Sequence, residues 1–292
     1  MTTTASERAA IDRAMMAFVA TYEPRLGGLA PAIRHALGGG GKRLRGLLTI
    51  AAYRACGGSG DAGALAAAVE IVHAYSLVHD DLPCMDDDVV RRGKPTVHVV
   101  HGVWPATVAG VAMVPLAARA AMDACAALAL DDTASRAIVA RLMRASGAGG
   151  MVGGQLLDLL GEGRETSLDG LETIHRGKTA SLIAAAASIG GEAAGAPADR
   201  VMALEAFGNA LGLAFQIMDD LLDVTSTTET LGKTAGRDTA LRKSTYPGLV
   251  GLGPARAMAE RKVEEARNHL AAAGILTDAL AGFARFVVQR ES

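Results

Sequence analysis

Hydrophobic residues recur along this chain at the three- and four-residue spacing of one helix face, with charged residues between them or at the ends of the runs. Glycine, proline and paired aspartates separate the runs, as at Gly38 to Gly41 and Asp131-Asp132. This pattern predicts helices over residues 6–20, 27–37, 43–57, 61–80, 87–92, 104–129, 134–147, 150–160, 168–190, 198–223, 229–233, 238–250, 253–273 and 277–289.

The composition agrees with an all-α protein. Half of the 292 residues are hydrophobic and only 3% are aromatic, while alanine is abundant and long β-branched runs are scarce. Such a composition favours helices that pack closely on one another. Because no repeat, low-complexity tract or Pro/Ser-rich linker divides the chain, we expect one domain over residues 1–292.

One apolar stretch is long enough to cross a bilayer. Residues 95–118 run for roughly 24 residues without a charge. Pro105 and Pro115 interrupt the stretch, and His98 and His101 lie inside it. We therefore predict a buried helical hairpin and no membrane span.

The remaining composition indicates a cytoplasmic protein that binds small anions. The N-terminus is polar and lacks the apolar core of a signal peptide, and the three cysteines show no metal-binding spacing. Basic residues gather locally, although the net charge is -2. Nucleic acid as a partner would require a basic balance overall, so we expect none.

Two aspartate clusters, at residues 80–88 and 219–223, carry the strongest chemical signal. Each ends an apolar run, where carboxylates without partners are costly to bury. Mg²⁺ takes one or two carboxylates from a protein and completes its shell with phosphate oxygens. The clusters therefore predict a diphosphate held by magnesium.

Spacing identifies the candidate ligands. Asp219 and Asp223 are four residues apart and share one helix face, with Asp220 angled away. Asp80 and Asp86 are six apart, and a backbone bulge at the intervening Pro83 would let them converge.

A third candidate ligand is Asp158, which lies in an otherwise apolar helix. For any single one of the aspartates, a helix cap or a solvated face remains the alternative interpretation.

The glycine run at residues 38–41 is followed by Lys42 and Arg45. Glycines let backbone approach an anion closely, and the two basic residues would share a face of the next helix. The run lacks the closing Lys-Ser/Thr of a nucleotide-binding P-loop. A flexible connection followed by a solvated helix start remains the alternative.

Six strings, in order, resemble the trans-isoprenyl diphosphate synthases, most closely the bacterial farnesyl and related short-chain enzymes. The resemblance runs from about residue 30 to the C-terminus. The strings occupy residues 39–45, 73–96, 153–159, 175–179, 215–223 and 232–247.

This resemblance implies a fold and an activity. The fold is a bundle of antiparallel helices around a central hydrophobic tunnel, assembled as a homodimer. The reaction is the Mg²⁺-dependent head-to-tail condensation of isopentenyl diphosphate with an allylic diphosphate (dimethylallyl or geranyl), using three Mg²⁺ per active site. The diphosphate leaves, isopentenyl diphosphate attacks the resulting carbocation, and the departing diphosphate accepts the proton.

The resemblance also implies a role for each matched residue. The metal ligands would be Asp80, Asp86, Asp219 and Asp223, with Asp158 in support. The allylic diphosphate would be bound by Arg91, Lys178, Lys233 and Lys243, and isopentenyl diphosphate by Lys42, Arg45, His73 and Arg92. The residues that act at the reacting centre would be Lys178, Thr179 and Gln216, the last two directing oxygen dipoles at the cation.

Product length depends on the floor of the tunnel. In this family a large side chain just before the first aspartate motif stops chain growth, and Tyr75, with Ser76 beside it, holds that position. Farnesyl diphosphate is therefore the expected product. Four departures from the family pattern allow geranyl or geranylgeranyl diphosphate instead: His101 where the family usually has phenylalanine, Val103 and Val111 where it has acidic residues, and Pro115.

Two other functions remain open. A terpene cyclase of the same architecture needs no isopentenyl diphosphate site, which Lys42 and Arg45 argue against. A non-catalytic helical subunit of a prenyl synthase would be expected to have lost motif aspartates, and residues 219–223 retain them.

Overall fold

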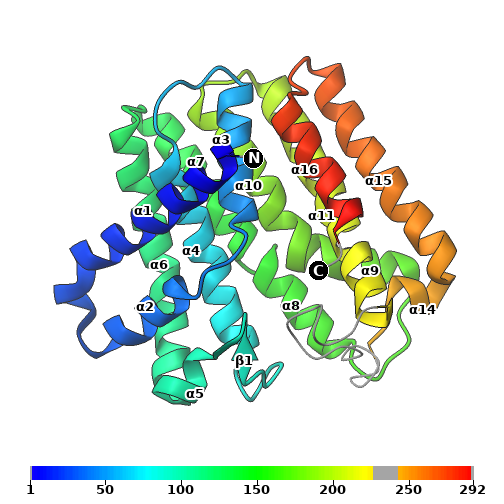
Figure 1. The fold of residues 1–292 in the computed structure, drawn as a ribbon, viewed down its shortest axis with the longest axis horizontal. Helices are drawn as coiled ribbons and strands as arrows, with labels where there is room; N and C mark the ends of the chain where they lie inside the picture. Colours follow the sequence, from blue (N-terminus) through cyan, green and yellow to red (C-terminus); the bar gives the residue numbers. More distant parts are fainter. Residues whose placement is uncertain (1, 226–242, 291–292) are drawn as a thin grey trace. The chain divides into compact units, whose positions relative to one another are not determined.

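The computed structural model describes residues 2–225 and 243–290. Within them, every regular element is helical except one hairpin of two short strands, β1 (Val90–Arg91) and β2 (Lys94–Pro95) (Figure 1). The predicted all-α class is confirmed. The helices predicted over 229–233 and over the first part of 238–250, together with Lys233, lie outside the described residues.

The chain divides into two compact units. One comprises Met1–Ile50 with Ser59–Val139, and the other Ala51–Gly58 with Ala140–Ser292. Two helices, α3 (Leu44–Ala55) and α7 (Asp132–Ser146), continue from one unit into the other along the sequence. The single domain expected over residues 1–292 stays a prediction.

The first unit is built around α4 and α6, which pack on each other and receive α1 and α2. Alanines make this packing close: Ala66 and Ala68 on α4 and Ala106 and Ala109 on α6 are fully buried. The helices that lie wholly within this unit are α1 (Thr2–Leu26), η1 (Gly27–Leu29), α2 (Ala30–Gly38), α4 (Gly63–Asp80), α5 (Val97–His101) and α6 (Val103–Ala127).

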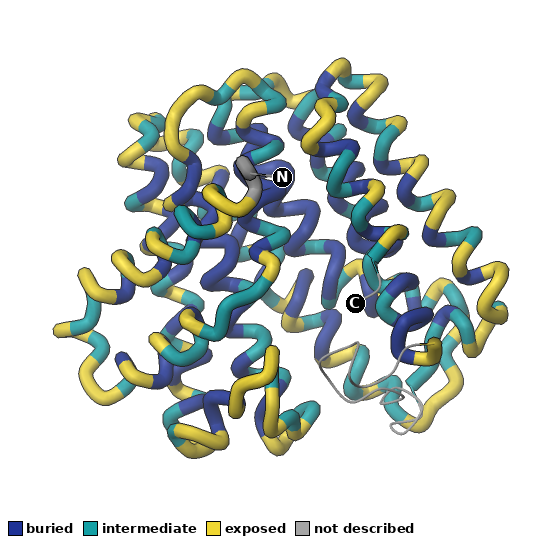
Figure 2. Tube along the Cα trace, viewed as in Figure 1, coloured by how far each residue is buried: buried dark blue, intermediate teal, exposed yellow. Residues whose placement is uncertain are grey.

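The second unit is centred on α11, which packs against α10, α15 and α16 (Figure 1). Gly208 and Gly212 on α11 lie against the backbone of Ala184 and Ala180, where any Cβ would overlap those residues. Figure 2 shows α10 and α11 buried over most of their length. The elements are α8 (Met151–Leu160), α9 (Leu168–His175), the π-helical turn η2 (Arg176–Ala180), α10 (Ser181–Ala193), α11 (Ala198–Thr225), α14 (Tyr246–Val250), α15 (Leu252–Ala272) and α16 (Asp278–Gln289).

The helix predicted over residues 87–92 is wrong. Residues 90–95 form the β1–β2 hairpin, with Val90 opposite Pro95 and Arg91 opposite Lys94. The two turn residues, Arg92 and Gly93, have positive φ angles of 55° and 74°. A two-residue turn with both φ values positive matches the twist of paired strands, so it directs the chain back instead of continuing a helix.

Two helices, α6 and α11, are long and apolar enough to cross a membrane by length and composition alone. The most apolar window of α11 is 67% buried within the structure and that of α6 is 44% buried. A core helix passes the same test, so the absence of a membrane span stays a prediction.

Candidate active site

The first aspartate motif folds into a compact turn. Helix α4 ends at Asp80, and the Asp86 N–H then donates to the Asp80 carbonyl at 2.8 Å. Pro83 lies between them and has no N–H with which to continue a helix. The backbones of the two residues therefore meet at the end of the helix and not at a bulge within it. The convergence of their carboxylates stays a prediction.

Arg91 holds the other carboxylates of this motif. Its Nε donates to Asp81 Oδ1 at 2.7 Å, and its guanidinium also donates to Asp88 Oδ2 at 3.2 Å. Asp81 is only 3% exposed. Burial raises the pKa of the Asp81 carboxyl, and the hydrogen bond from Arg91 opposes that rise. Arg91 thus orders the motif in addition to its predicted contact with a diphosphate.

The side chain of Arg92 contacts the glycine run at residues 38–41. The Arg92 guanidinium donates to the Gly40 carbonyl, and a Cβ on Gly41 would lie 2.5 Å from Arg92 Nη1. Gly41 has a φ of 134°, so both its conformation and the lack of a side chain are required there. The run thereby fixes where Arg92 presents its positive charge.

Lys42 and Arg45 do not share a helix. Helix α3 begins at Leu44, so only Arg45 of the two is helical, and the prediction of a common helix face is wrong. Arg43 has a positive φ of 51° at this point. The chain therefore turns sharply before the helix begins.

Arg43 is a structural residue that the sequence pattern did not distinguish from its basic neighbours. It is 4% exposed, with Nε donating to Asp12 Oδ1 at 2.7 Å and Nη2 donating to the Leu37 carbonyl at 2.8 Å. Glu70, 1% exposed, lies 3.7 Å from Arg43 Nη1. A carboxylate in the middle of an apolar helix was the available signal for this buried pair.

His73 lies on α4 two turns before Asp80, as expected. Burial, followed by the charges of Arg45, Arg92 and Arg91, lowers the pKa of the His73 imidazole well below 6.5. The imidazole is therefore neutral near pH 7, and it can donate or accept a hydrogen bond without adding charge.

In the second motif, Asp220 points inward. Its Oδ1 accepts from Gln216 Nε2 and its Oδ2 from the Tyr246 N–H, both at 3.0 Å. Asp220 is 2% exposed. Asp220 is therefore bonded within the protein. Asp223 is also buried, at 5% exposed, and the metal-binding face shared by Asp219 and Asp223 stays a prediction.

Arg290 was not anticipated from the sequence. Its Nη2 lies 2.7 Å from Asp219 Oδ1 and also donates to the Phe215 carbonyl at 2.7 Å. The guanidinium carbon stands 3.8 Å from the centre of the Phe215 ring. Arg290 is separated from α11 by more than sixty residues of chain, so no local motif indicates the contact.

Thr179 and Gln216 form one hydrogen-bonded chain with Asp220. The Thr179 hydroxyl donates to Gln216 Oε1 at 3.0 Å, and Gln216 Nε2 donates onward to Asp220. An ionised carboxylate only accepts, so the Gln216 amide must present its NH₂ to Asp220 and its oxygen to Thr179. Thr179 lies in η2, and π-helical turns of this kind are frequent at functional sites.

Asp158 joins the two lysines predicted to bind diphosphate. Lys178 Nζ lies 2.6 Å and Lys243 Nζ 2.9 Å from the same Oδ2 atom. Burial would raise the pKa of the Asp158 carboxyl, but the two ammonium groups lower it to about 2. The carboxylate therefore holds both lysines in place, and its support of a metal ion stays a prediction.

Acid should weaken the second unit through Asp158. Its pKa falls from 3.8 to about 2 on folding, so it contributes stability above pH 3.8 that is lost as the pH falls towards 2. The shift corresponds to about 2 kcal/mol. We expect wild type to lose about this much more stability than Asp158→Asn between about pH 5 and pH 2, measured by urea unfolding. The same pH dependence in both proteins would contradict the pairing.

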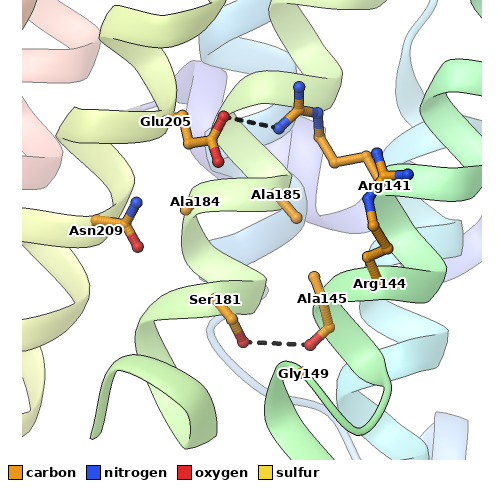
Figure 3. Close-up of a pocket in the computed structure, with 9 residues that line it drawn as sticks. All are labelled: Arg141, Arg144, Ala145, Gly149, Ser181, Ala184, Ala185, Glu205 and Asn209. Atoms are coloured by element: carbon orange, nitrogen blue, oxygen red, sulfur yellow. Dashed lines mark hydrogen bonds and ion pairs between the residues drawn. The ribbon is translucent and has the colours of Figure 1, made fainter. Parts of the chain in front are cut away.

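A hollow of about 210 Å³ between α7, α10 and α11 is a separate feature of the second unit (Figure 3). Arg141 on its wall donates to Glu205 and to Glu192, each at 2.9 Å. Ser181 on the floor donates to the Ala145 carbonyl (Figure 3). Two carboxylates therefore neutralise Arg141 within this hollow, which Arg144 also lines.

The predicted site residues are distributed over both units. The first unit carries Lys42, Arg45, His73, Tyr75, Ser76, Asp80, Asp86, Arg91 and Arg92, and the second carries Asp158, Lys178, Thr179, Gln216, Asp219, Asp223 and Lys243.

Known proteins are similar to this chain in sequence and in fold. A model of the polyprenyl synthetase family matches residues 28–274. Farnesyl diphosphate synthase of Escherichia coli is 46% identical over 86% of this chain and 85% of its own. Geranylgeranyl pyrophosphate synthase 12 of Arabidopsis thaliana is 44% identical over 82% of this chain and 67% of its own. A Helicobacter pylori geranyltransferase structure with magnesium and isoprenyl diphosphate has a TM-score of 0.79 at 30% identity, covering 97% of this chain and 96% of its own.

The all-α fold and the two aspartate motifs define a protein of the isoprenoid-synthesising transferase class. The chain belongs to the polyprenyl synthetase family.

Proposed function

We propose that this protein condenses isopentenyl diphosphate with dimethylallyl or geranyl diphosphate, in the presence of Mg²⁺, to give farnesyl diphosphate. The observation that supports the proposal most strongly is a feature common to the two aspartate motifs. In each motif the second aspartate, Asp81 or Asp220, is buried and bonded internally. The proposed metal ligands are Asp80, Asp86, Asp219 and Asp223. Of these, Asp219 also pairs with Arg290, and Asp223 is 5% exposed.

The available donors fit magnesium. They are carboxylate oxygens, which hard divalent cations prefer. Across residues 2–225 and 243–290, no three acidic, histidine or cysteine side chains converge to hold a metal without help. Mg²⁺ needs no such cage, because it takes one or two carboxylates and completes its shell with water and substrate phosphate. When bound, the metal would stabilise negative charge on the departing diphosphate.

The residues of the second unit would stabilise the allylic partner. Lys178 and Lys243, held by Asp158, would donate to the allylic diphosphate, with Lys233 from outside the described residues. The oxygens of Thr179 and Gln216 would face the developing carbocation without forming a bond to it, because both groups are neutral. Asp158, with a pKa of about 2, is too weak a base for the final deprotonation, which is assigned to the departing diphosphate.

The residues of the first unit would bind isopentenyl diphosphate. Arg45, Arg92 and Lys42 would supply the positive charge. Burial, and then the charges of Arg45 and Arg92, lower the pKa of the His73 imidazole. A neutral imidazole among arginines can complete the hydrogen bonds of the diphosphate without raising the local charge further.

Product analysis tests the activity directly. The purified protein is incubated with Mg²⁺, isopentenyl diphosphate and, separately, dimethylallyl, geranyl and farnesyl diphosphate. Farnesyl diphosphate from the two shorter starters, with farnesyl diphosphate itself inert, is the expected result. A longer product would keep the reaction and change the chain length, whereas no condensation with any starter would favour a terpene cyclase or a non-catalytic subunit.

Tyr75→Ala is expected to lengthen the product. Tyr75 is 4% exposed on α4, with its ring 6.0 Å from that of His79. Removing a buried ring opens a cavity, into which a growing chain could extend. The expected outcome is mainly geranylgeranyl diphosphate by chromatography. Ser76→Ala tests the neighbouring position, where the hydroxyl donates to the His73 carbonyl. An unchanged product from Tyr75→Ala would show that another residue sets the stop.

We also propose a cytoplasmic homodimer, with α6 as the contact. Trp104 is 80% exposed, and Val108 and Val111 on the same helix are 45% and 60% exposed. Such a row of apolar side chains is characteristic of a protein interface. Two of the departures from the family pattern, Val103 and Val111, are exposed on this helix, so they affect its surface more than its buried face. Light scattering of wild type and Trp104→Glu should distinguish dimer from monomer.

A further inference from the structure

Two histidines from different parts of the first unit contact each other. His35 on α2 lies with Nδ1 3.2 Å from Nε2 of His101, the last residue of α5, and the two rings meet edge to face. His35 Nε2 lies 2.9 Å from the carbonyl of Pro95, which ends β2. The contact therefore joins α2 to the end of α5, sixty-six positions apart along the chain.

The Pro95 carbonyl determines which ring nitrogens of His35 and His101 carry hydrogen. A carbonyl only accepts, so His35 Nε2 must carry a hydrogen. In a neutral imidazole the other nitrogen is then an acceptor, so His35 Nδ1 accepts and His101 Nε2 donates. Pro95, His35 and His101 therefore form one directed chain of hydrogen bonds.

These hydrogen bonds among Pro95, His35 and His101, called the brace below, hold the hairpin that carries Arg91 and Arg92. A hairpin with only two pairs of opposed residues is not stable by itself. It is attached to α2 and its following loop at two points, through the Pro95 carbonyl on His35 and through the Arg92 guanidinium on the Gly40 carbonyl. Helix α5 follows the hairpin, and its last residue, His101, contacts His35. The hairpin is therefore linked to His35 from its C-terminal side as well.

We propose that His35 and His101 are positioning residues that hold the β1–β2 hairpin so that Arg92 is placed for the diphosphate of isopentenyl diphosphate. This inference rests on the proposed function. Neither histidine touches the substrate in this role; His35 acts through the Pro95 carbonyl, and His101 acts by fixing the tautomer of His35.

The number of protons on the two histidines determines whether the hydrogen bond between them can form. One added proton can reside on His101 Nδ1 and leaves both hydrogen bonds intact. A second proton would place N–H against N–H between two cations and would break the histidine contact. Other titratable groups on the packed elements include the Arg34–Glu23 pair of α2 and α1, Lys94 of β2, His98 of α5 and His79 of α4. His98 is bonded to Thr96, and His79 to the Thr107 carbonyl.

The test measures isopentenyl diphosphate binding to the whole protein by calorimetry between pH 8 and pH 5. His35→Ala removes the donor to Pro95 and should weaken binding roughly fivefold at pH 8, with kcat changed less than KM. His35→Gln can still donate to Pro95 and should restore affinity to within about twofold. Because its amide cannot be protonated, this variant should lack any loss of affinity in acid that comes from protonation of His35.

His101→Phe should separate the two parts of the brace. It keeps a ring of similar size and leaves His35 free to be protonated while still donating to Pro95. Its affinity at pH 8 should stay within about twofold of wild type, with less loss in acid. His269→Gln, on α15 of the second unit, is the control for a histidine outside the unit that carries the hairpin. Ionisation of the diphosphate affects all variants alike, so the differences between their profiles report the brace.

The outcomes separate this inference from the proposed function. Wild-type affinity in His35→Ala, or pH profiles of His35→Gln and His101→Phe that match wild type, would overturn the brace while leaving the enzyme assignment intact. Failure of wild type to bind isopentenyl diphosphate at any pH would overturn the proposed function itself. Circular dichroism of each variant at each pH shows that the binding data come from folded protein.

Discussion

Asp219→Asn is expected to lower turnover by about 10³-fold while the protein remains folded. The substitution keeps the size of the side chain and an oxygen that can accept from Arg290, which lies 2.7 Å from Asp219 in the wild type. It removes the negative charge that the proposed metal ion requires. Because the metal would act on the departing diphosphate, the loss should appear in kcat with every allylic starter.

Asp199→Asn is the matched control for this effect. Asp199 lies in the first turn of the same helix, α11, and is exposed. Its loss should cost at most about 0.5 kcal/mol through the helix dipole, with turnover essentially unchanged. Near-normal activity of Asp219→Asn, in protein that melts normally by circular dichroism, would remove the magnesium hypothesis for this motif. Asp80→Asn makes the same test of the first motif.

Asp158→Asn is expected to show the second largest effect, about 10²-fold in turnover together with about 2 kcal/mol of stability at pH 7. Lys178 and Lys243 converge on one oxygen of Asp158, and all three side chains are at most one quarter exposed. Without the carboxylate, the two ammonium groups repel each other and are no longer oriented. Both should then bind the allylic diphosphate less well.

Glu162→Gln provides the comparison. Glu162 Oε1 is 3.3 Å from Lys243 Nζ and its side chain is 32% exposed, so it is a weaker partner of the same lysine. Its loss should cost less than about 0.5 kcal/mol and change turnover only slightly. Urea unfolding and steady-state kinetics of the two variants measure both quantities. Equal effects of Asp158→Asn and Glu162→Gln would show that Asp158 does not organise the lysines.

The sequence predicted the helices well where hydrophobic periodicity extended over several turns. The run that became α11 was expected at 198–223 and is Ala198–Thr225, because a helix with one continuous buried face produces that spacing. The prediction failed at residues 87–92, where the apolar pattern is too short to separate a helix from a hairpin. The Arg-Gly turn that decides the matter is a weak signal compared with Asn-Gly or Asp-Gly.

The candidate residues of the site could be found from spacing, but their partners could not. Asp219 and Asp223 share a face because they are four apart on one helix. That Asp158 holds Lys178 and Lys243 depends on segments separated by twenty and eighty-five positions along the chain. Arg43 was indistinguishable from Lys42 and Arg45 until its contacts with Asp12 and Glu70 were seen, because charge alone does not indicate burial.

By itself, the sequence determined the helical class, the two aspartate motifs and the resemblance to prenyl synthases, since each of these depends on residue types at short, regular intervals. Only the tertiary structure decided which charged groups pair internally, where Arg92 is held, and that His35, His101 and the Pro95 carbonyl meet. Those contacts join elements that are remote in sequence. They depend on how helices pack and where turns reverse the chain, which local periodicity does not specify.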